Sequence, residues 1–326
     1  MPSWIFKRIQ MVVLITGING FIGRHLSRIL IERDYVVQGT MRSHVELISD
    51  VSKIHITEDI GPTVNWKPIL KNIDVIIHLA AHVHVMKQTS NNTAYRHVNT
   101  LGTEHLARAA AAAGVKRMIY LSTIKVNGEE TIHTPFVEDS PTSAEDPYAL
   151  SKLEAERSLF QIASQTGLEV VILRPPLVYG AYVKGNFYKL LKLLHTGLVL
   201  PVASTKNKRS LVYVGNLVDA IINCIMHSTA ANKIYLISDC EDLSTPELAI
   251  RLSAALGKPA RVIAVPTALL HLLGTVTGRL NTIKRLINSL TVDCSKIRSE
   301  LDWTPPFTVN QGLKDTADWF INDHNS

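Results

Sequence analysis

Short apolar runs alternate with helix-like segments through the first half of the chain. The run Val12–Ile15 is continuous and rich in β-branched residues, which is typical of a strand buried on both faces. Apolar residues recur at helical spacing over 21–32, and a second β-branched run covers 35–40. This order of strand, helix and strand predicts a βαβ unit.

The same alternation continues toward the middle of the chain. It predicts strands at 74–79, 117–122, 169–173 and 233–237, with helices at about 100–113 and at 147–166. Repeated βα units require a parallel, doubly wound sheet with right-handed crossovers. We therefore expect an α/β fold of the Rossmann type with a smaller C-terminal α/β portion.

The breaks in this alternation predict two domains. We expect a nucleotide-binding domain over 11–176 plus about 215–242. The residues 177–214 and 243–326 are expected to hold the substrate, and residues 1–10 to be a short extension. A length of 326 residues agrees with this division, because it is long for one compact core.

Composition and charge limit the class of protein. Hydrophobic residues make up 46% and charged residues 19%, which excludes a disordered chain. The net charge of +6 comes from scattered Lys and Arg residues, so an anionic nucleotide substrate explains it better than nucleic acid does. Cys224, Cys240 and Cys294 form no CxxC pair, which favours reduced thiols in a cytoplasm over a disulfide framework.

Two further patterns have ordinary explanations. The most apolar stretch, 263–280, is interrupted by Pro266 and by several glycines and threonines, so we expect a helix packed on the substrate domain and no stable membrane insertion. The histidines His78, His82 and His84 are spaced as HxxxHxH. However, His78 ends a strand of the predicted nucleotide-binding domain, so no metal site is expected.

A glycine-rich loop lies between the first predicted strand and the first helix. Gly17 permits a tight turn, Gly20 lets the backbone approach a pyrophosphate, and Gly23 lets the helix pack on the strand. The helix N-terminus then directs its N–H groups toward the phosphates. This spacing predicts a dinucleotide site whose loop residues are Gly17, Asn19, Gly20, Phe21, Ile22 and Gly23.

The end of the second strand distinguishes NAD from NADP. An acid there binds the ribose 2′-hydroxyl of NAD, whereas a cation accommodates the 2′-phosphate of NADP. No acid occurs before Glu46, and Arg42 follows the strand directly. The sequence therefore favours NADP(H) held by Arg42, with NAD as the alternative if Arg42 is only a solvated surface residue.

Tyr148 and Lys152 are the candidate proton-transfer pair. They are four residues apart on the predicted helix 147–166, so they share one face. An ammonium about 5 Å from the phenol is expected to lower the pKa of Tyr148 by roughly two units, which suits proton transfer near neutral pH. Thr123 follows a predicted strand and can hydrogen-bond the same substrate oxygen.

The glycine loop, Thr123, Tyr148 and Lys152, in this order, resemble the extended short-chain dehydrogenases/reductases, specifically the NAD-dependent epimerase/dehydratase family. The likeness spans nearly everything after Met11. It implies a homodimer formed through two packed helices. It also implies that further motifs contact the cofactor, through Asp59, Ile60, Leu79, Ala80, Ala81, Asn99 and Pro175, together with Tyr148 and Lys152.

The same resemblance implies substrate contacts at Thr123, Asn186, Arg209 and Arg285. Two arginines suit a diphosphate, because their forked donors make bidentate, charge-assisted hydrogen bonds. A surface ion pair is the alternative for each arginine.

The residues after Thr123 bear on the type of reaction. Dehydratases that resemble this chain carry an acidic pair there, whereas Ile124 and Lys125 stand in those positions here, so dehydration is not expected. The segment 121–129 looks like that of bacterial surface-polysaccharide enzymes. This resemblance favours NADPH-dependent reduction of a UDP-4-keto-(6-deoxy)-N-acetylhexosamine at C4. The alternatives are a UDP-glucose or UDP-N-acetylglucosamine 4-epimerase with tightly bound NAD, and a non-catalytic NADP sensor.

Overall fold

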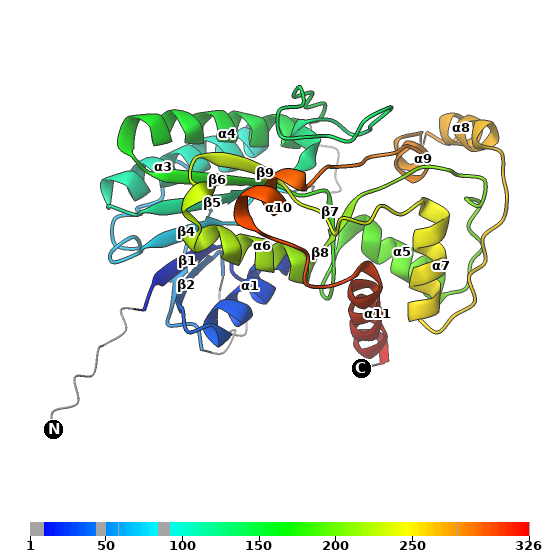
Figure 1. Cartoon of the computed structure of the whole chain (residues 1–326), viewed down its shortest axis with the longest axis horizontal. Coiled ribbons are helices and arrows are strands. Elements are labelled where there is room, and N and C mark those ends of the chain that lie inside the picture. The colour runs from blue at the N-terminus through cyan, green and yellow to red at the C-terminus, as the bar shows by residue number, and fades with distance from the viewer. Residues whose placement is uncertain (1–9, 44–49, 58, 84–91, 279, 326) are drawn as a thin grey trace. The chain divides into compact units, whose positions relative to one another are not determined.

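The computed structural model describes residues 10–43, 50–57, 59–83, 92–278 and 280–325. A parallel sheet of seven strands forms its centre, in the order β3-β2-β1-β4-β5-β6-β9 (Figure 1). The strands are β1 Val12–Thr16, β2 Val36–Met41, β3 Lys53–Ile56, β4 Val75–His78, β5 Arg117–Leu121, β6 Glu169–Arg174 and β9 Lys233–Leu236. The expected doubly wound α/β fold is confirmed.

Helices follow most of these strands. They are α1 Phe21–Glu32, α2 Asn92–Tyr95, α3 Thr103–Ala112, α4 Pro147–Thr166, α5 Gly185–His195, α6 Val214–Met226, α7 Thr245–Ala255, α8 Thr267–Val276, α9 Leu280–Ile287, α10 Ser295–Leu301 and α11 Val309–Asn325. A π-helical segment η1 covers Arg96–Gly102, and 3-10 turns cover η2 Ile124–Val126 and η3 Ser228–Ala230. A separate pair of strands, β7 Leu177–Tyr179 and β8 Leu211–Tyr213, forms a second small sheet.

The chain divides into two compact units. The first comprises the described residues of 1–121, 146–172 and 224–233, and the second those of 122–145, 173–223 and 234–326. The glycine loop, Tyr148 and Lys152 therefore belong to the first unit, whereas Thr123, Arg209 and Arg285 belong to the second. The expected functional domain boundaries stay a prediction, and the proposed extension 1–10 falls almost entirely outside the described residues.

Local sequence accounts for the best-predicted elements. Helix α4 occupies the predicted range because the Asp146 side chain accepts a hydrogen bond from Ala149 N at 2.7 Å, with Pro147 at the first helical position. It ends at Gly167, whose φ of 78° is left-handed. In β1, Val13–Ile15 are fully buried, as the continuous apolar run predicts.

Strand β3 and the start of helix α3 differ from the expectation, and strands β7 and β8 were not predicted either. Strand β3 was not predicted, because its short sequence KIHI has no continuous apolar run and lies at the edge of the sheet. The helix expected at 100–113 begins earlier as η1 and becomes α3 at Thr103. A Cβ at Gly102 would lie 2.2 Å from the Ile60 carbonyl oxygen, so only glycine lets this segment pass so close to Ile60.

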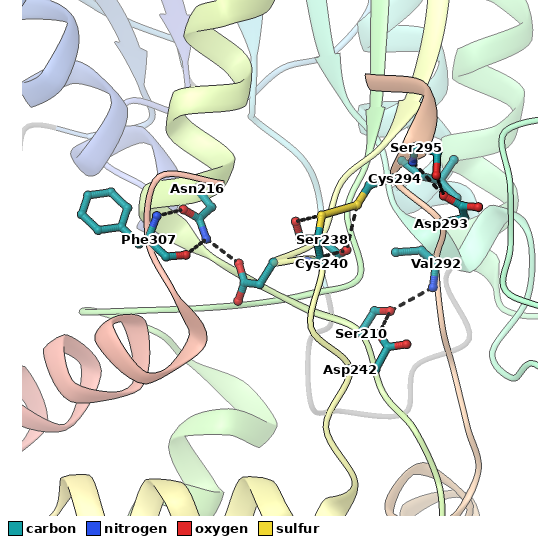
Figure 2. The surroundings of a disulfide bond; sticks show 12 residues. Ser210, Asn216, Ser238, Cys240, Asp242, Val292, Asp293, Cys294, Ser295 and Phe307 are labelled. Atoms are coloured by element: carbon teal, nitrogen blue, oxygen red, sulfur yellow. Dashed lines mark hydrogen bonds between the residues drawn. A yellow bond between two sulfur atoms is a disulfide. The ribbon is translucent and has the colours of Figure 1, made fainter. Parts of the chain in front are cut away.

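The cysteines correct one expectation. Cys240 and Cys294 form a disulfide in the second unit, with Cα atoms 6.8 Å apart (Figure 2). Their separation of 54 residues hides this proximity, because only the tertiary structure brings the loop after β9 beside the start of α10. The expectation that all three thiols are reduced is therefore wrong for this pair. Cys224 is free and buried, as expected, and burial raises its pKa to about 12.

The apolar stretch 263–280 contains helix α8. Among the described residues, no helix is both long enough and apolar enough to cross a membrane. Only Leu270 and Gly274 of α8 are buried. The expected helix is present, but it is packed on the rest of its unit along one narrow side only.

A buried histidine connects strand β4 to its neighbours in the first unit. The His78 Nδ1 atom is 2.6 Å from Thr16 Oγ1, and its Nε2 atom is 2.9 Å from Thr103 Oγ1. Burial, reinforced by the positive charge of Lys152, lowers the pKa of His78 to about 3. The native protein therefore keeps this imidazole neutral.

We predict that protonation of His78 in the unfolded chain makes the protein acid-sensitive. Unfolded His78 takes up its proton below pH 6.5, whereas the folded protein resists it down to about pH 3. In this window the free energy of unfolding should fall as pH falls, by up to about 1.4 kcal/mol per pH unit from this residue. Urea unfolding should give His78→Gln a lower free energy of unfolding than the wild type at pH 7. For this variant, that free energy should also decline less steeply as the pH falls. The exposed control His133→Gln should follow the wild type, and parallel profiles for all three proteins would contradict the assignment.

Candidate active site

The glycine loop has the shape that a dinucleotide phosphate requires. Gly17 has a left-handed φ of 71°, and a Cβ at Gly23 would lie 2.5 Å from the Gly17 carbonyl oxygen. Gly17 N and Ile18 N both donate to the Thr40 carbonyl oxygen, at 3.1 and 3.2 Å. The first turn of α1 contains no acidic residue, and Gly20 provides no side-chain cap. The N–H groups of Gly17 and Ile18 therefore already have an acceptor, and it is the N-terminus of α1 that suits an anionic phosphate.

The segment after β4 packs directly on this loop. Ala80 N donates to Thr16 Oγ1 at 3.2 Å, and Leu79 N donates to the Thr16 carbonyl oxygen at 3.3 Å. A Cβ at Gly17 would lie 3.1 Å from the Ala80 backbone, so the two segments approach closely. The structure therefore brings the residues 79–81 together with the glycine loop.

The residues expected near the adenosine half differ in exposure. Arg42 directly follows β2 and is exposed. Asp59 is also exposed, and its carboxylate accepts a hydrogen bond from Ile60 N at 2.8 Å. Ile60 itself is buried. The nearest acid considered in the sequence, Glu46, lies outside the described residues.

Asn99 connects the segment after β4 to helix α4. Its Oδ1 atom accepts from His82 N at 2.7 Å, and its Nδ2 atom donates to the His82 carbonyl oxygen at 3.1 Å. The same Nδ2 atom donates to Ser151 Oγ at 3.0 Å. Ser151 precedes Lys152, so Asn99 positions α4 as well as the segment after β4. The sequence indicated Asn99 but not Ser151, which no motif identified.

Lys152 lies in the core of the first unit. Its side chain is only 2% exposed, and its Nζ atom donates to the Leu121 carbonyl oxygen at 2.9 Å. The ammonium also lies 4.5 Å from the centroid of the Tyr120 ring and 6.0 Å from that of Tyr148. Burial lowers the pKa of Lys152 to about 7, although the nearby Glu156 carboxylate opposes this shift.

The expected effect of Lys152 on Tyr148 is not what the structure shows. Burial raises the pKa of Tyr148, and Asp146 and Tyr95 raise it further. The sequence argument was wrong because it placed a full positive charge beside a solvated phenol. In the structure both groups are desolvated, and the Lys152 ammonium binds the Leu121 carbonyl oxygen at the end of β5.

Thr123 lies two residues beyond β5, in the second unit. Its backbone is extended, and its Oγ1 atom accepts a hydrogen bond from Lys125 N at 3.3 Å. Ile124 N donates to the Pro175 carbonyl oxygen at 2.9 Å. Pro175, which was expected to contact the cofactor, thus also holds the turn that carries Thr123.

Three cations of the second unit surround one carboxylate. Glu129 binds Lys125 at 2.5 Å and Arg285 at 3.8 Å. Burial lowers the pKa of Arg209, and the charge of Arg285 lowers it further, whereas Glu129 raises it. The guanidinium of Arg209 donates to the Asn288 carbonyl oxygen at 3.0 Å. Positive charge is in excess here, as an anionic ligand requires.

The expected substrate contact of Asn186 stays a prediction. Asn186 is exposed at the second position of α5, and none of the described contacts joins it to the arginine cluster. Glu129 and Lys125 were missed as members of the cluster, because their ion pairs depend on long-range folding. No group of three His, Cys, Asp or Glu side chains suited to a metal ion occurs in the part of the chain that the structure describes. His84 lies outside that part.

Known proteins resemble this chain over most of its length. A model of the NAD dependent epimerase/dehydratase family matches residues 13–238. UDP-glucose 4-epimerase of Vibrio cholerae is 42% identical over 324 residues, which cover 98% of each chain. An N-acetyl-alpha-D-glucosaminyl-diphospho-ditrans,octacis-undecaprenol 4-epimerase of Escherichia coli O157:H7 is 26% identical, over 94% of each chain.

Solved structures share the fold. UDP-glucose 4-epimerase of Thermotoga maritima, with UDP-glucose, has a TM-score of 0.77 and 22% identity, covering 96% of this chain and all of that one. UDP-glucuronic acid 4-epimerase of Bacillus cereus, in complex with NAD, has a TM-score of 0.78 at 22% identity with the same coverage. At this level of identity the likeness concerns the fold alone.

We predict that Asn99→Leu disrupts both the core of the first unit and its cofactor site. The substitution keeps the side chain's size but leaves two backbone groups of His82 without a partner. It also removes one of the two hydrogen bonds of the Ser151 hydroxyl, which still donates to the Tyr148 carbonyl oxygen. Each buried group left unsatisfied costs about 1–3 kcal/mol. The free energy of unfolding should therefore fall by about that amount or more, and NAD binding measured by calorimetry should weaken. Asn186→Leu, at an exposed position, should leave both values nearly unchanged.

Proposed function

Because the chain belongs to the NAD-dependent epimerase/dehydratase family, we propose that it is a UDP-hexose 4-epimerase that retains NAD through each turnover. The substrate pair is UDP-glucose and UDP-galactose, or their N-acetyl forms. The observation that carries this proposal is the 42% identity, across 98% of both chains, to a UDP-glucose 4-epimerase. Tyr148, Lys152 and Thr123 are all present to support it.

The family is NAD-dependent, so the predicted nicotinamide dinucleotide is confirmed. The residues of the first unit fit this group, because side chains at Gly17 and Gly23 would fill the space beside the loop. The preference for NADP(H) depended on Arg42 alone, and the reductase interpretation depended on Arg42 together with the resemblance of segment 121–129. Arg42 is exposed directly after β2, which is expected both of a residue that binds a 2′-phosphate and of a solvated surface residue. The relatives favour the epimerase.

NAD, when bound, supplies the acceptor and donor for the hydride at C4 of the sugar. The chain's own residues handle the proton and the geometry. Tyr148 in its phenolate form accepts the proton of the C4 hydroxyl and later returns it, and the Thr123 hydroxyl orients the same oxygen. Lys152, held by Leu121 at the end of β5, lies on the same face of α4 as Tyr148 and stabilises the phenolate that this step requires.

The arginine cluster supplies the affinity for the substrate. Arg209 and Arg285 bind the diphosphate, since forked guanidinium donors match its oxygens. Both curated relatives are named for sugars attached through a diphosphate, to uridine in one case and to a polyprenol in the other. The higher identity to the UDP-sugar enzyme favours uridine here. A homodimer stays a prediction.

We predict that the purified protein interconverts UDP-glucose and UDP-galactose, or the N-acetyl pair, without added cofactor. Tyr148→Phe removes the proton acceptor and should lower kcat by about 10²- to 10⁴-fold. Tyr188→Phe, on α5, is the control and should keep full activity. The rate is measured by separating the two UDP-sugars chromatographically. Oxidation of added NADPH with a UDP-4-keto sugar, with no interconversion of hexoses, would replace the epimerase by the reductase.

We predict that Arg209→Ala weakens substrate binding more than it slows the chemical step. Loss of a charge-assisted hydrogen bond to the diphosphate costs about 1.5–3 kcal/mol, which corresponds to a rise in KM of about 10- to 150-fold. Arg209→Lys should recover part of the affinity, because it restores the charge without the fork. Arg28→Ala, which removes an exposed arginine paired with Glu32, serves as the control. An unchanged KM for Arg209→Ala would remove Arg209 from the site.

A further inference from the structure

Helix α8 carries an exposed apolar stripe. Leu269, Leu272, Leu273 and Val276 are 46%, 59%, 50% and 77% exposed. Their spacing of three, four and seven residues places them on one face of the helix. We call these four residues the α8 stripe. Most exposed apolar residues of a protein stand singly, so four on one short helix form a distinct surface.

The other side of α8 packs on the neighbouring helix α9 (Figure 1). Leu270 is 3% exposed, and a Cβ at Gly274 would lie 2.9 Å from Ile283 Cγ1 and 3.2 Å from Leu280 Cα. Leu270 and Gly274 are four residues apart, so they define the inner face of the helix. The α8 stripe is therefore the outer face, and the packing against α9 leaves it uncovered.

Basic residues surround the stripe in the sequence without any acidic residue among them. The stretch 248–292 contains no Asp or Glu, whereas its basic residues are Arg251, Lys258, Arg261, Arg279, Lys284 and Arg285. Their combined charge equals the net charge of +6 of the whole chain. Among those that the structure describes, Arg251 pairs with Glu241 and Arg285 with Glu129. Lys258, Arg261 and Lys284 are exposed.

We propose that the α8 stripe docks on the surface of a lipid bilayer that contains anionic lipids. A helix with an apolar face and basic residues beside it is the pattern of a segment that lies in the membrane interface. Each basic residue near the surface adds attraction to anionic headgroups. No described helix can span the bilayer, so the contact is peripheral.

A second copy of this chain is the less suitable partner. In a twofold dimer the same patch lies on both sides of the interface. Pairing the α8 stripe with itself would bring together two basic stretches that contain no acidic residue, although Arg251 and Arg285 have carboxylate partners outside the stretch. An anionic lipid surface has the complementary charge. The proposal goes beyond the epimerase function and does not depend on it.

The test is co-sedimentation of the full-length protein with vesicles. We expect binding to vesicles of phosphatidylcholine with phosphatidylglycerol, weaker binding to phosphatidylcholine alone, and a decrease as salt increases. The double variant Leu272→Ser/Val276→Ser should lower the bound fraction on both kinds of vesicle, with a fall in partitioning of about ten-fold or more. Both positions are exposed, so the variant should keep the wild-type circular dichroism and thermal unfolding. Ile132→Ser, 81% exposed in the same unit, is the matched control and should bind like the wild type.

A second pair of variants separates the charge from the apolar contact. Lys258→Gln/Lys284→Gln should weaken binding only to the vesicles with phosphatidylglycerol, whereas the exposed control Lys71→Gln should not. Failure of the wild-type protein to sediment with either kind of vesicle would overturn the proposal. Unchanged binding by Leu272→Ser/Val276→Ser would do the same. One further result would overturn the proposal. If the wild-type protein does not bind vesicles but forms an oligomer in ultracentrifugation that Leu272→Ser/Val276→Ser dissociates, the stripe is a contact between copies.

Discussion

The first unit is organised around a buried ammonium group. Lys152 is almost fully removed from water, which is costly for a cation unless other groups replace its hydration. The Leu121 carbonyl oxygen, the Tyr120 ring and the Glu156 carboxylate provide this replacement. Leu121 is the last residue of β5. By binding its carbonyl oxygen, Lys152 also fixes α4 against the edge of the sheet where a parallel α/β fold binds its ligands.

Polar side chains extend this arrangement to the cofactor segment. Asn99 joins His82 to Ser151, and His78 joins Thr16 to Thr103, so buried hydrogen bonds connect the loops that surround the glycine turn. Such bonds stabilise a unit only when every member has a partner. Two sets of buried hydrogen bonds therefore position the glycine loop and helix α4, which lie far apart in the sequence.

The second unit contributes charge rather than proton transfer. Lys125 and Arg285 pair with Glu129, which also acts electrostatically on Arg209, and we propose that this group of cations binds a diphosphate. The same stretch of sequence that supplies Arg285 also supplies the exposed face of α8. The proposed substrate binding by Arg285 and the proposed membrane contact therefore involve the neighbouring helices α9 and α8.

The sequence by itself determined the α/β fold, the limits of α1 and α4, the glycine loop and the pair Tyr148 and Lys152. These features follow from local spacing: apolar periodicity, helix caps and residues one helical turn apart. Only the tertiary structure decided the directions of the pKa shifts, the pairing of Cys240 with Cys294 and the ion pairs of Glu129. Each of these depends on burial or on contacts between distant segments, which spacing along the chain does not encode.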